Sequence, residues 1–312
     1  MRHWLVHVPN GATLTCRMRL PPHILVVNGI KVRRPVFLLG APHSGTDLLA
    51  RALKRSPGFH VTMGRASVAH VVYAFARKPS LAATSGAVRV MRDALAESWQ
   101  VLPRSCGQCA EPCREAGGVI GTGPCVSTGD VTRFGDGSPD LLYSVPVLLQ
   151  AFPDARFVQL IRDGRDAVAG MLADPACLAW FKPAMLTGQT EFPNAFFGVS
   201  KDEHLGRWRD MPAAGKSALR WRSAVRISAE LRRTLPEEQL LTLRYEDLVL
   251  RPPQSVATLT EFLESRVSKV VLYDPGVPKP GAYESRLRHD DVKLVEKVAR
   301  EELKRLGYLK KR

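Results

Sequence analysis

The sequence predicts an α/β fold in which helices cover both faces of a central parallel sheet. Short apolar runs alternate along the chain with segments whose apolar residues recur at helical spacing. The expected strands are 35–40, 156–161 and 239–244. The expected helices are 46–56, 87–99, 163–173, 214–234 and 253–264. Strands that alternate with helices form parallel sheets, because each crossover helix packs on a face of the sheet.

The first strand and helix are read from "PVFLLGAPHSGTDLLARALKRSP" (35–57). An apolar run ends at Gly40, a loop follows, and Leu48, Leu49 and Leu53 then fall on one helical face. The stretch 103–139 is rich in Gly and Cys and is expected to be a loop or an insertion.

The second half repeats the strand–helix pattern. "YSVPVLLQAFPDARFVQLIRDGRDAVAGML" predicts a helix, a turn, the strand 156–161 and the helix 163–173. Residues 174–213 carry Gly and Pro and are expected to be mostly loop. A terminal helix is expected from the helical spacing of Val292, Val295, Ala299, Leu303 and Leu306.

These elements suggest one main domain with a short addition. Residues 1–34 are expected to form a β-rich N-terminal extension with a turn at "PNG" (9–11), and 35–312 the main domain, with a Cys-rich insertion at about 103–139. No apolar stretch reaches the roughly 20 residues that cross a bilayer. The first 20 residues lack a signal-peptide core. We therefore expect a cytoplasmic protein with no transmembrane segment.

The chain is strongly basic, with 45 Lys and Arg against 30 Asp and Glu, a net charge of +15. This surplus suits a polyanionic partner, although a basic solvated surface is an equally good explanation. The sequence has no zinc-finger, RNP or helix-turn-helix signature, so we expect no nucleic-acid partner.

The loop Gly40–Thr46 lies where α/β sheets bind ligands, after a strand and before a helix. Its backbone N–H groups and the start of the next helix suit an oxyanion. The glycine spacing is that of a Walker A loop, but Thr46 occupies the lysine position. The loop therefore predicts phosphate binding without ATP hydrolysis.

Four segments in order resemble the sulfotransferase family, in its broad bacterial branch that is also similar to tyrosylprotein sulfotransferases. They are "PHSGTDLL" (42–49), "FVQLIRDGRDAVAGM" (157–171), "ALRWRSAVRISAELRRTLPEEQLLTLRYEDLVLRP" (218–252) and "LRHDDVKLVEKVAREELKRLGYL" (287–309). The resemblance implies a P-loop-like three-layer sandwich. It also implies sulfuryl transfer from 3′-phosphoadenosine 5′-phosphosulfate to a hydroxyl of a glycan, lipid or secondary metabolite, with no metal in that step.

The resemblance also assigns residues. The implied donor-binding set is Pro42, His43, Ser44, Gly45, Thr46, Asp47, Arg162, Gly170, Lys279 and Arg286. His43 stands where the family places Lys or Arg, beside the oxygen that joins sulfur to the leaving phosphate. Arg162 matches the 3′-phosphate arginine, and Gly170 replaces a serine. Asp136 falls in the slot of the general base, although a turn-capping role is open, and Asp47 and His60 are weaker candidates.

Departures from the family pattern leave alternatives open. His43, Gly137 and Gly170 also fit a nucleotide-binding protein on the same fold that has lost turnover. A P-loop nucleotide kinase is less favoured because of Thr46. The oligomeric state is open.

Cys106, Cys109, Cys113 and Cys125 have the spacing C-x2-C-x3-C-x11-C. Two thiolates of a C-x2-C turn can bind one cation, and two more complete a tetrahedral zinc site. We expect a structural zinc here, with reduced thiols or redox disulfides as the alternative.

Overall fold

A computed structural model describes residues 24–101, 106, 109, 111–119, 123–186 and 190–310. Its centre is a five-stranded sheet in the order β4-β5-β3-β6-β7, in which every neighbouring pair is parallel. The strands are β3 (Val36–Gly40), β4 (Phe59–Thr62), β5 (Arg133–Asp136), β6 (Arg156–Ile161) and β7 (Leu240–Arg244). The predicted α/β class is confirmed.

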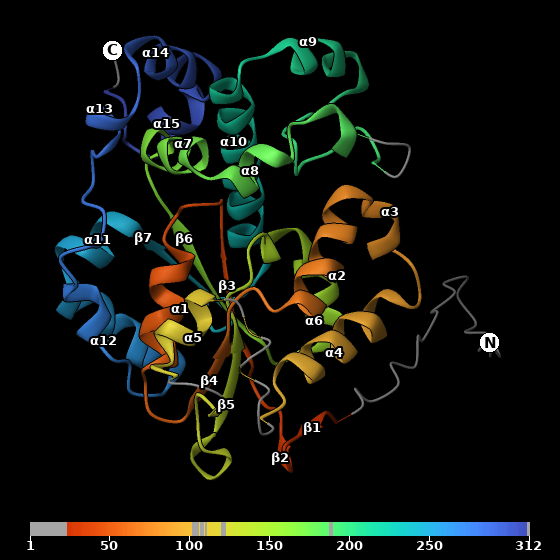
Figure 1. Cartoon of the computed structure of the whole chain (residues 1–312), viewed down its shortest axis with the longest axis vertical. Helices are drawn as coiled ribbons and strands as arrows, with labels where there is room; N and C mark the ends of the chain where they lie inside the picture. The colour runs from red at the N-terminus through yellow and green to blue at the C-terminus, as the bar shows by residue number, and fades with distance from the viewer. Residues whose placement is uncertain are drawn as a thin grey trace, which may run out of the picture.

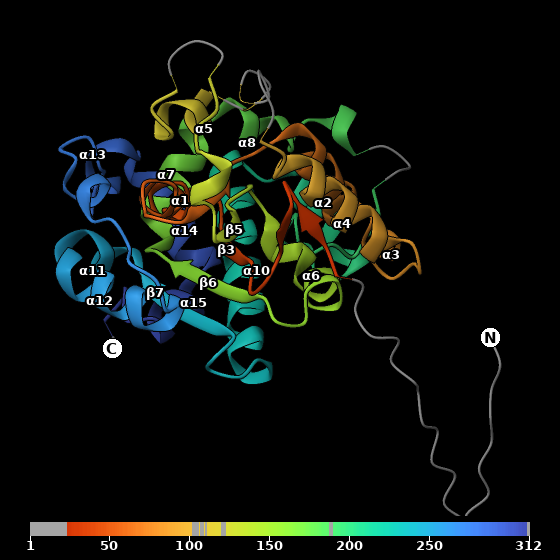
Figure 2. The same ribbon diagram turned by 90° about the horizontal axis from the view of Figure 1, so that it is seen from below.

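Helices cover both faces of this sheet and complete three layers (Figure 1, Figure 2). The longer helices are α1 (Thr46–Lys54), α2 (Ala66–Arg77), α4 (Ala87–Ser98), α7 (Gly164–Ala173), α10 (Ala213–Thr234), α12 (Pro252–Leu263) and α14 (His289–Val298). The shorter ones are α3 (Pro79–Ala82), α5 (Glu111–Ala116), α6 (Val145–Ala151), α8 (Pro175–Ala179), α9 (Leu205–Asp210), α11 (Tyr245–Leu250), α13 (Tyr283–Arg286) and α15 (Arg300–Arg305).

The central strand β3 shows how the two faces are separated. Val36 and Leu38 belong to the hydrophobic cluster that α1 and α12 share. Phe37 and Leu39 belong to the cluster that contains α2, α4 and α6. Because successive side chains of a strand point to opposite faces, a continuous apolar run is what a strand covered on both sides requires.

The expected strands 35–40, 156–161 and 239–244 correspond to β3, β6 and β7, and the expected long helices are also present. The stretch 103–139 differs from the prediction, because it contains α5 and ends in β5, which lies between β4 and β3. Gly135 is tightly enclosed there: a Cβ would lie 3.0 Å from the Val36 carbonyl oxygen. The predicted insertion therefore stops before 133.

A small hairpin, β1 (Val26–Val27) and β2 (Ile30–Lys31), precedes the sheet. The Asn28 side chain donates to the Trp99 carbonyl (2.9 Å) and accepts from the Val101 amide (3.0 Å). The hairpin thus packs on the main domain, while the predicted turn at 9–11 lies outside the described residues. Across the described part of the chain, no helix combines the length and hydrophobicity of a membrane span.

Candidate functional site

The loop between β3 and α1 depends on two glycines. A Cβ on Gly40 would lie 3.0 Å from the Leu160 carbonyl oxygen and 3.1 Å from Cγ2 of Thr46. Gly45 has φ +97°, and a Cβ there would lie 2.4 Å from Cδ2 of Tyr245. The loop therefore turns sharply between β6 and the Tyr245 ring, and the next helix, α1, begins at Thr46.

Arg162, at the end of β6, is fixed against this loop. Its Nη1 donates to the His43 carbonyl oxygen (3.0 Å), and its guanidinium lies 4.0 Å from the centre of the Tyr245 ring. Nη2 lies 3.8 Å from Oδ2 of Asp166. The side chain is buried, and its Nε has no hydrogen-bond partner among the described residues. The two segments predicted to bind one donor are therefore in contact.

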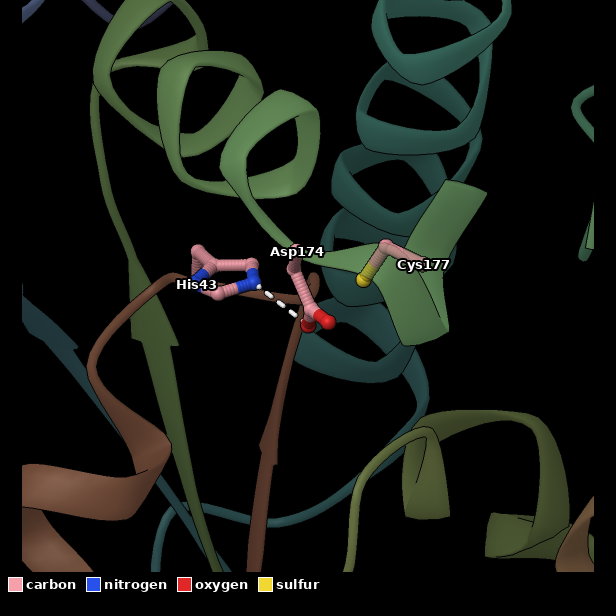
Figure 3. Close-up of side chains that lie close together, drawn as sticks. All are labelled: His43, Asp174 and Cys177. Atoms are coloured by element: carbon pink, nitrogen blue, oxygen red, sulfur yellow. Dashed lines mark hydrogen bonds and ion pairs between the residues drawn. The ribbon is translucent and has the colours of Figure 1, made fainter. Parts of the chain in front are cut away.

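The His43 side chain points towards α7 and the start of α8 (Figure 3). Its Nε2 lies 3.0 Å from Oδ2 of Asp174, with both side chains about one-third exposed. His43 has φ +59°. Its ring lies against Gly170, where a Cβ would be only 2.6 Å from Cβ and Cγ of His43. Sequence reasoning predicted His43 and Gly170 separately and missed Asp174.

Asp174 is an ionised carboxylate with several donors. Besides facing His43, it accepts a hydrogen bond from the Ala176 amide (2.8 Å) and caps α8. Burial disfavours its charge, but hydrogen bonds from His43, the Ala176 amide and Cys177 outweigh that effect and lower the pKa of Asp174. In the described part of the chain, His43, Asp174 and Cys177 are the one group of three whose ligand atoms lie within 4.8 Å of one another.

A pocket of about 100 Å³ lies over the loop and is lined by His43, Gly45, Arg162, Tyr245 and Pro278 among others. It is small for a nucleotide, since ligand pockets usually measure roughly 300–1,000 Å³. The Tyr245 hydroxyl donates to the Pro278 carbonyl oxygen (2.6 Å), which holds the segment around 278 over the loop.

Asp166 fixes the continuation of that segment. Its carboxylate accepts hydrogen bonds from the amides of Gly281 (2.9 Å) and Tyr283 (2.8 Å). The predicted donor ligands Lys279 and Arg286 flank this contact and are exposed.

The family model for the sulfotransferase family matches residues 35–175. The match covers slightly less than half of the chain. The matched segment contains the loop, Asp136, Arg162 and Gly170, and it ends one residue after Asp174. The curated proteins include no match to this sequence.

Several solved structures to which this chain is similar are sulfotransferases. The enzyme from Alicyclobacillus acidocaldarius is 17% identical, with 86% of this chain and 97% of that chain covered and a TM-score of 0.39. STF9 from Mycobacterium avium is 14% identical, with 88% of this chain and 77% of that chain covered and a TM-score of 0.45. Mouse SULT7A1, solved as a complex with PAP, is 12% identical, with 90% of this chain and 95% of that chain covered and a TM-score of 0.43.

The predicted base candidates of this chain have different surroundings. Asp136 is fully buried at the end of β5, where its carboxylate accepts from the Thr62 hydroxyl (2.6 Å) and the Ser138 amide (2.8 Å). Burial raises the pKa of Asp136 to about 6, although these hydrogen bonds oppose the shift. Asp47 is exposed and pairs with Arg51 (3.3 Å). Burial, together with the charges of Lys54 and Arg65, lowers the pKa of His60 to about 3 and keeps it neutral.

The four clustered cysteines are free thiols that meet in pairs. The Cys125 amide donates to Sγ of Cys106 (3.2 Å), and Cys113 is hydrogen-bonded to Cys109. The ammonium of Lys54 lies 3.2 Å from Sγ of Cys125 and also contacts Cys113. Among the described residues, no three of these sulfurs form a group whose ligand atoms all lie within 4.8 Å of one another. The zinc site stays a prediction.

Proposed function

We propose that the protein transfers a sulfuryl group from 3′-phosphoadenosine 5′-phosphosulfate to a hydroxyl acceptor. The observation that supports the proposal is the contact between Arg162 and the β3–α1 loop, because a buried cation then lies beside a loop whose backbone N–H groups suit an oxyanion. Thr46 at the lysine position argues against nucleotide hydrolysis with magnesium.

In this proposal each part of the loop has one task. The backbone N–H groups of Gly45 and Thr46, with the hydroxyls of Ser44 and Thr46, hold the 5′-phosphosulfate, and the Arg162 guanidinium holds the 3′-phosphate. The bond between sulfur and the bridging oxygen breaks as the acceptor oxygen bonds to sulfur. Negative charge builds on the bridging oxygen, and His43 is the side chain that donates to it. The acceptor hydroxyl proton passes to a base.

Asp136 remains the proposed base from its position in the sequence. Its burial and its two hydrogen bonds favour the competing role of stabilising the turn after β5. A carboxylate that receives the acceptor proton must contact the acceptor, so Asp136→Asn separates the two roles: loss of transfer supports the base, and unchanged transfer supports the turn.

The acceptor class proposed is a hydroxyl of a glycan, lipid or secondary metabolite, and the cytoplasmic location also stays a prediction. The second candidate function is a nucleotide-binding protein without turnover, which Gly170 and Gly137 favour.

Calorimetry and a transfer assay test these readings. Tight binding of adenosine 3′,5′-bisphosphate without magnesium supports the sulfotransferase proposal, and magnesium-dependent ATP binding supports a kinase. Transfer from radiolabelled donor to any member of an acceptor panel then supports the enzyme over the impaired binder. His43→Ala is expected to lower turnover much more than donor affinity, and unchanged turnover rejects its role.

A further inference from the structure

His43 is held by three contacts, one to its backbone and two to its ring. Its backbone carbonyl accepts from Arg162 (3.0 Å), which fixes the loop at the point where His43 has φ +59°. The ring lies on Gly170 of α7, and Nε2 faces Asp174, the residue that ends this helix. Residues four apart lie on one face of a helix, so Gly170 and Asp174 present a single surface to the ring.

We propose that Gly170 and Asp174 position the His43 imidazole for the transfer step, so that the three residues act as one unit. The inference rests on the proposed function and adds two positioning residues to it. It also explains the glycine, because any larger residue at 170 would occupy the volume of the ring: a Cβ would lie 2.6 Å from Cγ and 2.8 Å from Nδ1 of His43.

Asp174 determines which ring nitrogen is available. An ionised carboxylate only accepts hydrogen bonds, so the proton of the 3.0 Å contact belongs to Nε2. Nδ1 is the ring nitrogen left for the bridging oxygen, and it can donate there only when the ring is the imidazolium, in which both nitrogens carry a proton. Asp174 thus sets the orientation of the His43 ring, as the carboxylate partner of a catalytic histidine does.

Asparagine is the informative substitution at 174. Asp and Asn are about equally good helix caps, so Asp174→Asn keeps the hydrogen bond from Ala176 that starts α8. It removes the charge that faces Nε2. A matched control is Asp154→Asn, since Asp154 is an exposed carboxylate that also accepts a hydrogen bond from a backbone N–H, that of Arg34 (2.8 Å), and it precedes the start of β6, at the opposite end of the strand from the loop.

The experiment measures three quantities on the full chain: bisphosphate affinity by calorimetry, release of radiolabelled sulfate from the donor with water as acceptor, and melting temperature. A chelator is present, because His43, Asp174 and Cys177 could together hold a cation. For Asp174→Asn we expect sulfate release to fall at least about tenfold, with bisphosphate Kd within about threefold of wild type. Asp154→Asn should match the wild type in sulfate release and in bisphosphate Kd.

Gly170→Ala tests the contact without reference to activity. It should lower the melting temperature when His43 is present and have no such effect in a His43→Gly background, because both the ring and the His43 Cβ that the new methyl group would meet are then gone. Equal shifts in both backgrounds overturn the coupling, and wild-type sulfate release by Asp174→Asn overturns the positioning role.

The failure of the proposed function has different signatures. A wild-type protein that does not bind the bisphosphate contradicts the proposed function itself. A wild-type protein that binds it but releases no sulfate supports the impaired-binder alternative and overturns the positioning role in transfer.

Discussion

Replacing Gly45 by alanine tests the packing that shapes the donor loop. Gly45 has φ +97°, and an added Cβ would lie 2.4 and 2.8 Å from Cδ2 and Cε2 of Tyr245. That ring cannot move cheaply, because it is buried between Gly45 and the Arg162 guanidinium and its hydroxyl is bonded to Pro278. The substitution must therefore displace the loop or the ring.

The expected cost has two parts. A non-glycine residue in the left-handed region costs roughly 1–2 kcal/mol. Overpacking a well-packed site adds typically about 1–3 kcal/mol, so Gly45→Ala should lower the free energy of unfolding by about 2–5 kcal/mol. Gly29 is the matched control: it has φ +77°, but a Cβ there would meet nothing within 4 Å. Gly29→Ala should therefore lose only the stability that the left-handed backbone conformation costs.

Urea unfolding of both variants measures this difference. Gly45→Ala should also weaken binding of adenosine 3′,5′-bisphosphate, whereas Gly29→Ala should not. In a Tyr245→Ala background, Gly45→Ala should cost less stability than it does in the wild type, because the ring that the methyl group meets is absent. If the two glycine variants lose the same stability, the clash with Tyr245 does not shape the loop and the reasoning is refuted.

Three further outcomes follow from buried charges. Arg162→Lys should weaken bisphosphate binding about 10–100-fold, because an ammonium cannot reproduce the bidentate fork, and calorimetry at wild-type affinity would contradict this. The raised pKa of Asp136, about 6 against 3.8, means that the fold binds its proton more tightly than the unfolded chain. About 3 kcal/mol of stability should therefore be lost as the pH rises from about 4 through 6, and Asp136→Asn should remove that loss in urea unfolding; the same pH dependence in both proteins would contradict it. Arg220→Ala should cost about 3–5 kcal/mol in urea unfolding, because it leaves Asp140, 2.7 Å away and buried, without its partner; a loss under 1 kcal/mol would contradict this.

The strands that the sequence predicts are those whose apolar residues indicate burial on both faces of the sheet. β6 is buried at all six positions, and its run of apolar residues is unbroken but for Arg156 and Gln159. β5 has only one large apolar residue, Phe134, and its Gly135 is a packing requirement visible only once Val36 and Val61 are in place. Its four residues therefore look like a loop in the sequence, although they lie near the centre of the sheet.

The residues of the candidate site also divide into those that the sequence predicts and those that it does not. The loop and Arg162 could be predicted because each is part of a contiguous pattern at the end of a strand. Asp174 precedes Pro175, which marks a helix start and nothing more, and its partner His43 lies 131 positions earlier. The buried ion pair of Asp140 and Arg220 cannot be predicted from the sequence either, because no local pattern joins two residues 80 positions apart.

A crystal structure with adenosine 3′,5′-bisphosphate tests the central claim most directly. The account predicts that the 5′-phosphate lies on the backbone amides of the Gly40–Thr46 loop and that the 3′-phosphate bonds to the Arg162 guanidinium, with the segment around Pro278 moved outward to admit the nucleotide. A bisphosphate bound away from this loop, or bound with Arg162 still directed only at the His43 carbonyl, would contradict it.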